Sequence, residues 1–109
     1  MLNQEQCEAC RAGAPLVGRD EQLVLLTEIP LWSVQTFDSI ERLVREFTFS
    51  DFVQAQSFAN AVADLAEALN HHPKIVLEWG RVEVSWWTHK IRGLHRNDFV
   101  AAAKTDLLY

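Results

Sequence analysis

The segment from residue 52 to residue 70 is the strongest structural signal in the sequence, because its apolar residues recur at steps of three and four. This is the spacing of one helix face, and the residues that share it are Phe52, Ala55, Phe58, Ala59, Val62, Leu65, Ala66 and Leu69. Ser50 or Asp51 can cap the start of the helix, and Pro73 prevents its continuation. A long helix with one apolar face has to bury that face against a second layer.

Strand-like runs are predicted in pairs on either side of this helix. The four runs are residues 32–37, 43–49, 75–79 and 81–89. The first pair turns around Asp38 and Ser39, and the second turns tightly around Gly80. In the last run Val82, Val84 and Trp86 alternate with Glu83, Ser85 and Trp87. One face of the sheet is therefore expected to be covered and the other to be of mixed character.

Shorter helices are expected before and after these elements. Asp20 can cap a helix that runs through Ile29, and Asn97 or Asp98 can begin one that reaches Leu107. The order is helix, two strands, long helix, two strands, helix. It predicts an α+β fold with two layers, in which helices pack on one face of a four-stranded antiparallel sheet.

Length and composition fit one globular domain: the chain has 109 residues, of which 49% are hydrophobic and 23% charged. Residues 1–29 are predicted to form an N-terminal lead with a short helix, and residues 30–109 the α+β body. No run approaches the roughly 20 consecutive apolar residues of a membrane helix, and the first residues lack the pattern of an export signal. We therefore expect a cytoplasmic protein without a membrane partner.

The charge balance argues against general binding to nucleic acid. The formal net charge is −5, from 10 Lys and Arg against 15 Asp and Glu, whereas a phosphate-backbone binder needs a broad positive surface. The outer strands of an open sheet carry unpaired backbone groups, which favour pairing between copies of the chain. A homo-oligomer is expected.

Both cysteines lie in one short motif, Cys7-Glu8-Ala9-Cys10. Such a spacing can supply half of a zinc site or a redox pair. The chain has no second cysteine pair to complete a tetrahedral zinc site, and the motif lies in a predicted tail. The interpretation that the cysteines have no role in the chemistry is therefore favoured.

Three histidines occur where structural elements are expected to end: His71 and His72 after the long helix, and His89 after the last strand. Glu67 and His71 are four apart, so their side chains are expected to meet on one helix face, where the carboxylate favours the protonated imidazole. His72 precedes Pro73 and should take an extended backbone that points its ring elsewhere. Such a group can run acid and base steps together. The alternatives are histidines that only complement the helix dipole, and a zinc site, which adjacent histidines form poorly.

Other residues near these histidines have simpler interpretations. Of the three tryptophans in the second hairpin, Trp79, Trp86 and Trp87, at least two are expected in the core, and one could line a slot for a flat heterocycle. His95 is predicted to lie in a surface loop. Without further information Asp98 is an acid placed favourably at a helix start.

The spacing of these residues nevertheless matches a known pattern. Glu67-Ala68-Leu69-Asn70-His71-His72-Pro73 is followed by Trp79, by Thr88-His89 and by Asp98, and the run from Phe47 to Phe52 precedes it. The chain resembles the pterin-4a-carbinolamine dehydratases over about residues 30–108. The resemblance implies a four-stranded antiparallel sheet with helices on one face, and dimers or tetramers.

The resemblance also implies an activity and a site. The reaction is loss of water from a 4a-hydroxytetrahydropterin, which gives a quinonoid dihydropterin, and it needs no metal or organic cofactor. The candidate catalytic residues are His71, His72 and His89, with His71 and His89 moving protons and His72 chiefly binding substrate. Glu67 and Asp98 support the imidazoles, and Pro73, Thr88 and Lys90 border the pterin.

After His89 the chain departs from the pattern of many members, with Lys90, Ile91, Arg92 and Gly93 in place of an acidic residue and a Gly-Gly turn. The Trp86-Trp87 pair and the run from Gly93 to Asp98 are similar to a bacterial branch associated with phenylalanine hydroxylase. Two alternatives stay open. One is a protein-binding regulatory module, such as a dimerisation cofactor of a homeodomain transcription factor or a regulator of hydroxylase expression. The other is a dehydratase of molybdopterin metabolism.

Overall fold

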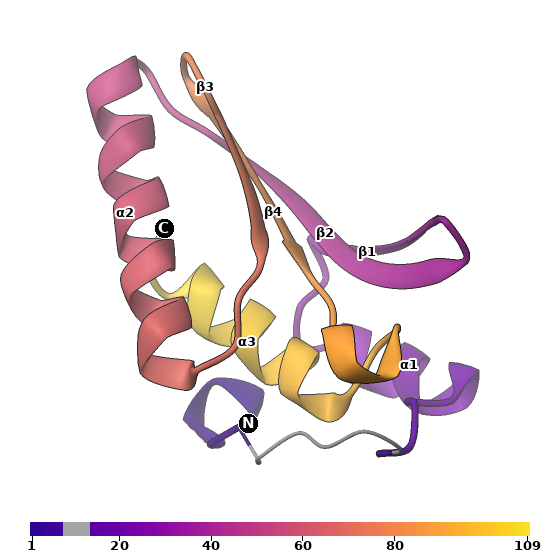
Figure 1. The fold of residues 1–109 in the computed structure, drawn as a ribbon. Helices are drawn as coiled ribbons and strands as arrows, with labels where there is room; N and C mark the ends of the chain where they lie inside the picture. Colours follow the sequence, from indigo (N-terminus) through magenta and orange to yellow (C-terminus); the bar gives the residue numbers. More distant parts are fainter. Residues whose placement is uncertain (8–13) are drawn as a thin grey trace.

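A computed structural model describes residues 1–7 and 14–109 and confirms the predicted α+β architecture (Figure 1). The strands are β1 (Ser33–Phe37), β2 (Ile40–Thr48), β3 (Lys74–Glu78) and β4 (Arg81–Trp86). The helices are α1 (Arg19–Leu26), α2 (Phe52–Leu69) and α3 (Arg96–Asp106), with short 3-10 helices η1 (Leu2–Gln4) and η2 (His89–Ile91). The sheet is antiparallel in the order β1-β2-β4-β3, so the two longest strands lie in its centre. The helices pack on one face of it.

The two hairpin turns have the backbone geometry that their residues allow. Asp38 and Ser39 both have positive φ, 51° and 64°, a pair of values that matches the twist of the flanking strands. Gly80 has a φ of 68°, and a Cβ placed on it would lie 2.9 Å from the carbonyl oxygen of Phe49. Both the conformation and the space therefore require glycine at the β3–β4 turn.

Helix α2 begins and ends at identifiable caps. Asp51 Oδ1 accepts a hydrogen bond from the backbone N–H of Gln54 at 2.8 Å. At the other end Asn70 has a φ of 50°, and the N–H of His71 reaches back to the carbonyl of Ala66 at 3.1 Å. This left-handed ending turns the chain out of the helix axis directly before the histidine pair.

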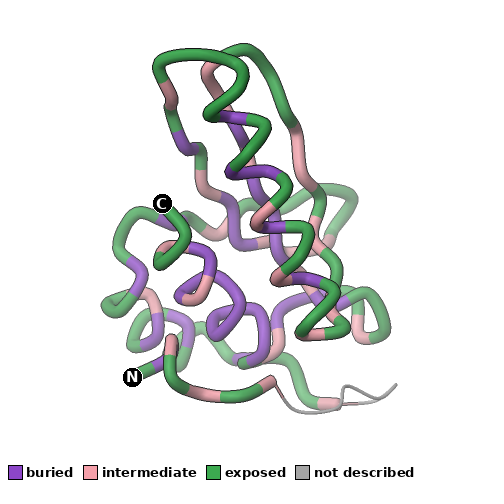
Figure 2. Tube along the Cα trace, turned by 90° about the vertical axis from the view of Figure 1, so that its left-hand side faces the viewer, coloured by how far each residue is buried: buried purple, intermediate pink, exposed green. Residues whose placement is uncertain are grey.

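One face of α2 is buried, as the sequence pattern predicts (Figure 2). Its buried residues are Ala55, Phe58, Ala59, Val62 and Ala66. Phe52 was expected in the same stripe but is 42% exposed. Phe52 is the first residue of α2, at the end of the apolar face.

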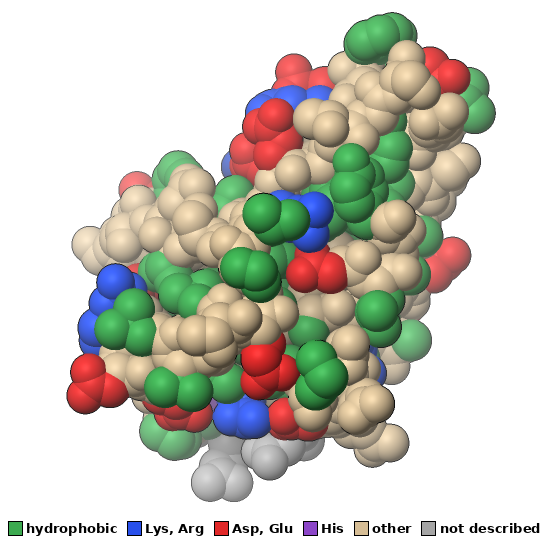
Figure 3. Space-filling model, turned by 180° about the vertical axis from the view of Figure 1, so that it is seen from behind, with side chains coloured by type: hydrophobic (Ala, Val, Ile, Leu, Met, Phe, Trp, Pro, Cys, Tyr) green, Lys and Arg blue, Asp and Glu red, His purple; other side chains and the backbone are tan. Residues whose placement is uncertain are grey.

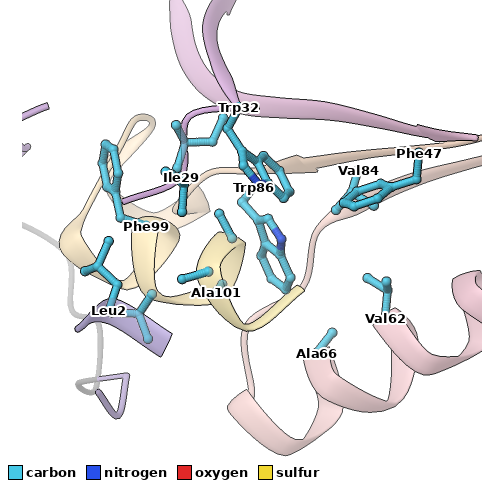
Figure 4. Packing of buried hydrophobic residues seen from close by; sticks show 14 of the residues in the cluster. Leu2, Ile29, Trp32, Phe47, Val62, Ala66, Val84, Trp86, Phe99 and Ala101 are labelled. Atoms are coloured by element: carbon cyan, nitrogen blue, oxygen red, sulfur yellow. The ribbon is translucent and has the colours of Figure 1, made fainter. Parts of the chain in front are cut away.

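The core lies between the sheet and the helices and includes the N-terminal part of the chain (Figure 4). Phe47, Val84 and Trp86 come from the sheet, Val62 and Ala66 from α2, Phe99 and Ala101 from α3, and Leu2, Ile29 and Trp32 from the first third of the chain. The backbone N–H of Leu2 donates to Glu28 Oε1 at 2.9 Å. Arg96 of α3 makes two hydrogen bonds to Glu5, at 2.9 and 2.8 Å, and lowers the pKa of that carboxyl. The described part of the N-terminal lead is thus packed against α3.

The register of α1 differs from the prediction. The helix is capped by Gly18 and not by Asp20, and it buries Gln22 and Leu25, whereas Leu23 is half exposed. The amide of Gln22 donates to Glu41 Oε1 of β2 at 3.0 Å. This buried polar contact sets the face of the short helix, which a hydrophobic pattern cannot reveal.

The last strand and the last helix also differ from the prediction. Strand β4 ends at Trp86, because the N–H of Thr88 pairs with the carbonyl of Gly93 at 2.8 Å and closes a loop around η2. His89 therefore opens a 3-10 helix and does not end a strand. Helix α3 begins at Arg96, one residue before Asn97 and two before Asp98, the two predicted starts.

The surface offers no single charge sign on the face seen in Figure 3, where acidic and basic side chains lie among hydrophobic ones. Within the described residues, no helix combines the length and the apolar character needed to cross a membrane.

We predict that Asp51→Ala lowers the free energy of unfolding by about 1 kcal/mol, because the first turn of α2 loses its side-chain cap. Asp51→Asn keeps an acceptor oxygen and should restore most of that loss. Urea denaturation followed by circular dichroism measures both. Asp64→Ala, at an exposed position of the same helix, should stay within about 0.5 kcal/mol of the parent. An equal loss in Asp51→Ala and Asp64→Ala would contradict the capping role.

Candidate active site

The carboxylate of Asp98 is fully buried and joins three segments of the chain. Its Oδ1 accepts from His71 Nε2 at 2.6 Å, and its Oδ2 accepts from Thr88 Oγ1 at 2.7 Å and from the backbone N–H of His95 at 2.9 Å. A buried carboxylate is tolerated only when such donors replace water. Asp98 is therefore the point at which the end of α2, the end of β4 and the start of α3 meet.

His95 was predicted to lie in a surface loop before the last helix, and it does lie in the loop that leads into α3. It is the N-cap of α3, half-buried, and its Nδ1 accepts from the N–H of Asn97 at 3.0 Å. Its own N–H donates to Asp98, so the two residues form a reciprocal capping box. His is not among the preferred N-cap residues, which are Ser, Thr, Asp, Asn and Gly, so the sequence pattern does not indicate a cap at this position.

His71 is held on two sides. Only 12% of its side chain is exposed, with Nε2 on Asp98 and the ring stacked on Trp86, at 5.3 Å between ring centroids and 24° between planes. The expected pairing of Glu67 with His71 is wrong. Because Asn70 ends the helix in a left-handed conformation, His71 leaves the face on which Glu67 lies.

Glu67 instead contacts His72. Its Oε2 lies 2.5 Å from His72 Nε2, and both side chains are mostly exposed. The two adjacent histidines thus face different carboxylates, as the extended residue before Pro73 predicts. An exposed pair of this kind adds little to the stability of the fold. Its effect on the site is to hold the His72 ring in one position.

His89 lies beside this pair. Its Nε2 donates to the backbone carbonyl of His72 at 3.3 Å, and its ring packs on Trp87 with 4.5 Å between centroids. Of the other predicted site residues, Thr88 is buried, Pro73 half-buried and Lys90 exposed. The structure therefore brings His71, His72 and His89 to one region, bounded by the end of α2, η2 and the start of α3.

All three histidines use the same ring nitrogen for their protein contact. The partners of Nε2 are carboxylate or carbonyl oxygens, which can only accept, so Nε2 carries a proton in each ring. This tautomer is assigned from the partners. Nδ1 is left as the atom that can gain or lose a proton during a reaction.

The tryptophans of the second hairpin have three different environments. Trp86 is fully buried, Trp87 is half-buried and packs against the core, and Trp79 is 70% exposed.

Among the described residues, no group of three or more His, Cys, Asp or Glu is arranged to hold a metal ion. A groove of about 800 Å³ lies at the opposite end of α2, between Phe49, Val53, Phe58 and Tyr109, and contains none of the predicted site residues.

Cys7 lies behind the site and Cys10 lies outside the described residues. The Cys7 thiol is half-buried, 3.7 Å from the carbonyl of Asn97. Burial raises the pKa of this thiol to about 11, and the charge of Asp98 acts in the same direction. A thiol of this kind is a poor nucleophile and a poor metal ligand at neutral pH.

Known proteins match this chain along almost its whole length. A family model described as pterin 4 alpha carbinolamine dehydratase matches residues 15–108. The chain belongs to this family. Its members are hydro-lyases, and two proteins named pterin-4-alpha-carbinolamine dehydratase are close relatives. The one from Saccharophagus degradans is 60% identical over 99% of this chain and 96% of its own length, and the one from Marinobacter nauticus is 56% identical over 99% and 97%.

Solved structures show the same fold. The transcriptional coactivator/pterin dehydratase from Brucella melitensis superimposes with a TM-score of 0.76 at 31% identity, over 86% of this chain and 98% of its own. A pterin dehydratase-like protein described as a RuBisCO assembly factor in the alpha-carboxysome superimposes with a TM-score of 0.61 at 26% identity, over 71% and 87%. The dehydratase fold thus accompanies more than one described role.

We predict that Cys7 of the folded dehydratase-family chain reacts slowly with iodoacetamide. In a Cys10→Ser variant Cys7 is the one thiol, and at pH 8 its thiolate fraction falls about 100-fold if the pKa rises from 9 to 11. Alkylation followed by mass spectrometry should be at least tenfold slower in the native protein than in concentrated urea. Equal rates would contradict the buried, high-pKa thiol.

Proposed function

We propose that the chain dehydrates 4a-hydroxytetrahydropterin to quinonoid dihydropterin by acid and base catalysis at His71 and His89. The observation that carries the proposal is that adjacent His71 and His72 are each held by a contact, His71 by Asp98 and the His72 carbonyl by His89, in a chain whose family is the carbinolamine dehydratases. The reaction needs two proton movements and no electron transfer. Two imidazoles, each held through Nε2, suit it.

The chemistry balances with these groups alone. One imidazolium gives a proton to the 4a-hydroxyl, the C–O bond breaks, and water leaves with both bonding electrons. A neutral imidazole takes the proton from the ring nitrogen, whose electron pair forms the new double bond. Each transfer by a positioned group typically contributes about 100-fold to 10,000-fold. The two histidines exchange protonation states in one turnover, and proton exchange with solvent restores them.

The remaining site residues position the histidines and the substrate. Asp98 fixes the tautomer and the orientation of His71 by accepting from its Nε2, as a carboxylate does behind a catalytic histidine. Glu67 orients His72, which together with Pro73, Thr88 and Lys90 borders the pterin in this proposal. Thr88 is buried and its hydroxyl donates to Asp98, so it contributes to the site by holding that carboxylate.

The source of the substrate follows from the resemblance to the bacterial branch. We place the reaction after phenylalanine hydroxylation in the cytoplasm, where it regenerates the pterin cofactor. Dehydration in molybdopterin metabolism is the alternative, and comparing the rates on the two pterins separates them.

We also propose that the chain is a homodimer or homotetramer. Strands β1 and β3 lie at the edges of the sheet, and Phe37 of β1 is 47% exposed. Pairing between copies would cover such an edge. Sedimentation equilibrium should give two or four times the 12.5 kDa chain mass, and a mass of one chain would contradict the proposal.

A regulatory role is the second candidate, because the Brucella melitensis relative is described as both a transcriptional coactivator and a dehydratase. A role in protein binding would depend on the surface and not on proton transfer. A His71→Ala/His89→Ala double variant separates the two functions. It should lose dehydratase activity, and any partner binding should survive.

We predict that His71→Ala and His89→Ala each lower kcat/KM for the 4a-carbinolamine at least about tenfold, because each removes one proton-transfer group. The assay follows decay of the carbinolamine absorbance in the presence of a chelator. Asp64→Ala, on the exposed face of α2, should keep the parent rate. Full activity in both histidine variants, or activity that returns only with added zinc, would contradict the mechanism.

A further inference from the structure

The two proposed proton-transfer histidines are held very differently. His71 has a 2.6 Å hydrogen bond to a buried carboxylate and a stacking partner inside the core. His89 is exposed, and its hydrogen bond to the His72 carbonyl is 3.3 Å, beyond the usual range of 2.7–3.2 Å for N–H···O. Orientation of the His89 ring must therefore depend on its other contact, the face of Trp87.

Trp87 follows core-facing Trp86 and so lies toward the other face of the sheet, where its ring has a second contact besides His89. The guanidinium carbon of Arg42 lies 4.1 Å from the centroid of the Trp87 ring and 5.0 Å from that of Phe37. Leu43 pairs with Trp86 in the register of β2 and β4, so the preceding and following residues, Arg42 and Trp87, are neighbours on that face. A continuous stack runs from Phe37 through Arg42 and Trp87 to His89.

Arg42 contacts these two rings, and within the part of the chain that the structure describes it has no ion pair with an acid. Among the described residues its Nε is the buried side-chain nitrogen or oxygen that has no hydrogen-bond partner. An unpartnered buried donor is unfavourable, whereas a guanidinium over an indole ring is attracted by the electron-rich face of that ring. By contrast Arg81, on the same face at the other end of β4, is ion-paired with Glu46 and Glu78.

We propose that Arg42 and Trp87 are positioning residues that fix the His89 imidazole for proton transfer; this inference rests on the proposed dehydratase function. Trp87 supplies the surface on which the imidazole lies. Arg42 prevents the indole from turning, because its planar group is wedged between Trp87 and Phe37. Neither side chain needs to touch the reacting atoms.

The effect expected on catalysis is on the chemical step. Arg42→Met and Trp87→Leu keep much of the side-chain volume but remove the flat stacking groups, and each should lower kcat at least about fivefold with KM within about twofold, since a loosened imidazole loses its reactive orientation. Trp87→Phe keeps a ring and should retain about half of the parent kcat. The kcat of Arg42→Lys should lie between that of the parent chain and that of Arg42→Met, because an ammonium group keeps the charge but does not stack as a plane. Arg81→Met is the matched control and should keep the parent kcat.

A double variant tests whether Arg42 acts through His89. In a His89→Ala background, Arg42→Met should change kcat by less than about twofold, because the group that it positions is gone. A general structural role would lower kcat further in that background. Additive losses, or a fully active Arg42→Met, would overturn the inference.

NMR of the His89 ring separates this inference from the proposed function. The Cε1–H signal that disappears in His89→Ala should move in both Trp87→Leu and Arg42→Met, as the ring shifts relative to the indole, and should stay in place in Arg81→Met. If the parent chain lacks dehydratase activity, the proposed function fails. The NMR measurement then shows by itself whether Arg42 and Trp87 hold the His89 ring in position. An unmoved His89 signal in Arg42→Met would overturn the inference whatever the activity.

Discussion

The buried carboxylate of Asp98 is the constraint on which the site depends. Its desolvation is compensated by donors from three separate segments, His71 after α2, Thr88 after β4 and the N–H of His95 before α3. None of these donors can be withdrawn without leaving a buried charge short of a partner. The requirement to satisfy one carboxylate therefore sets the relative positions of two helices and a strand, and it brings a histidine to the same point.

Most of the fold could be predicted from local sequence patterns, because the spacing of apolar residues indicates which face of a helix or strand is buried. The stripe on α2, the cap at Asp51 and the glycine of the β3–β4 turn are each decided by neighbouring residues. The register of α1 could not be predicted in this way. It depends on the contact of Gln22 with Glu41 of another element, and no periodicity of apolar residues encodes a buried polar contact.

The site could be predicted as a set of residues but not as a set of pairs. The resemblance named His71, His72, His89, Glu67 and Asp98 as a set, and the structure shows three contacts among them: His71 with Asp98, His72 with Glu67, and His89 with the His72 carbonyl. The expected Glu67–His71 pair assumed that the helix continues through residue 71. The left-handed conformation of Asn70 ends the helix first, so that His71 contacts Asp98 and Glu67 contacts His72. An Asn directly before the histidine pair was the available signal, since Asn is one of the few residues that adopt this conformation readily.

The two sides of the sheet contribute to the site in different ways. His71 belongs to the covered side, where Trp86 and Asp98 are also part of the core, so a change there alters folding and chemistry together. His89 belongs to the open side, where its ring contacts Trp87 and Trp87 in turn contacts Arg42. A site of this kind keeps one proton-transfer group as rigid as the fold and leaves the other adjustable by surface residues. Variation among related chains in rate or in pterin preference should therefore arise on the open face of the sheet more often than around Asp98.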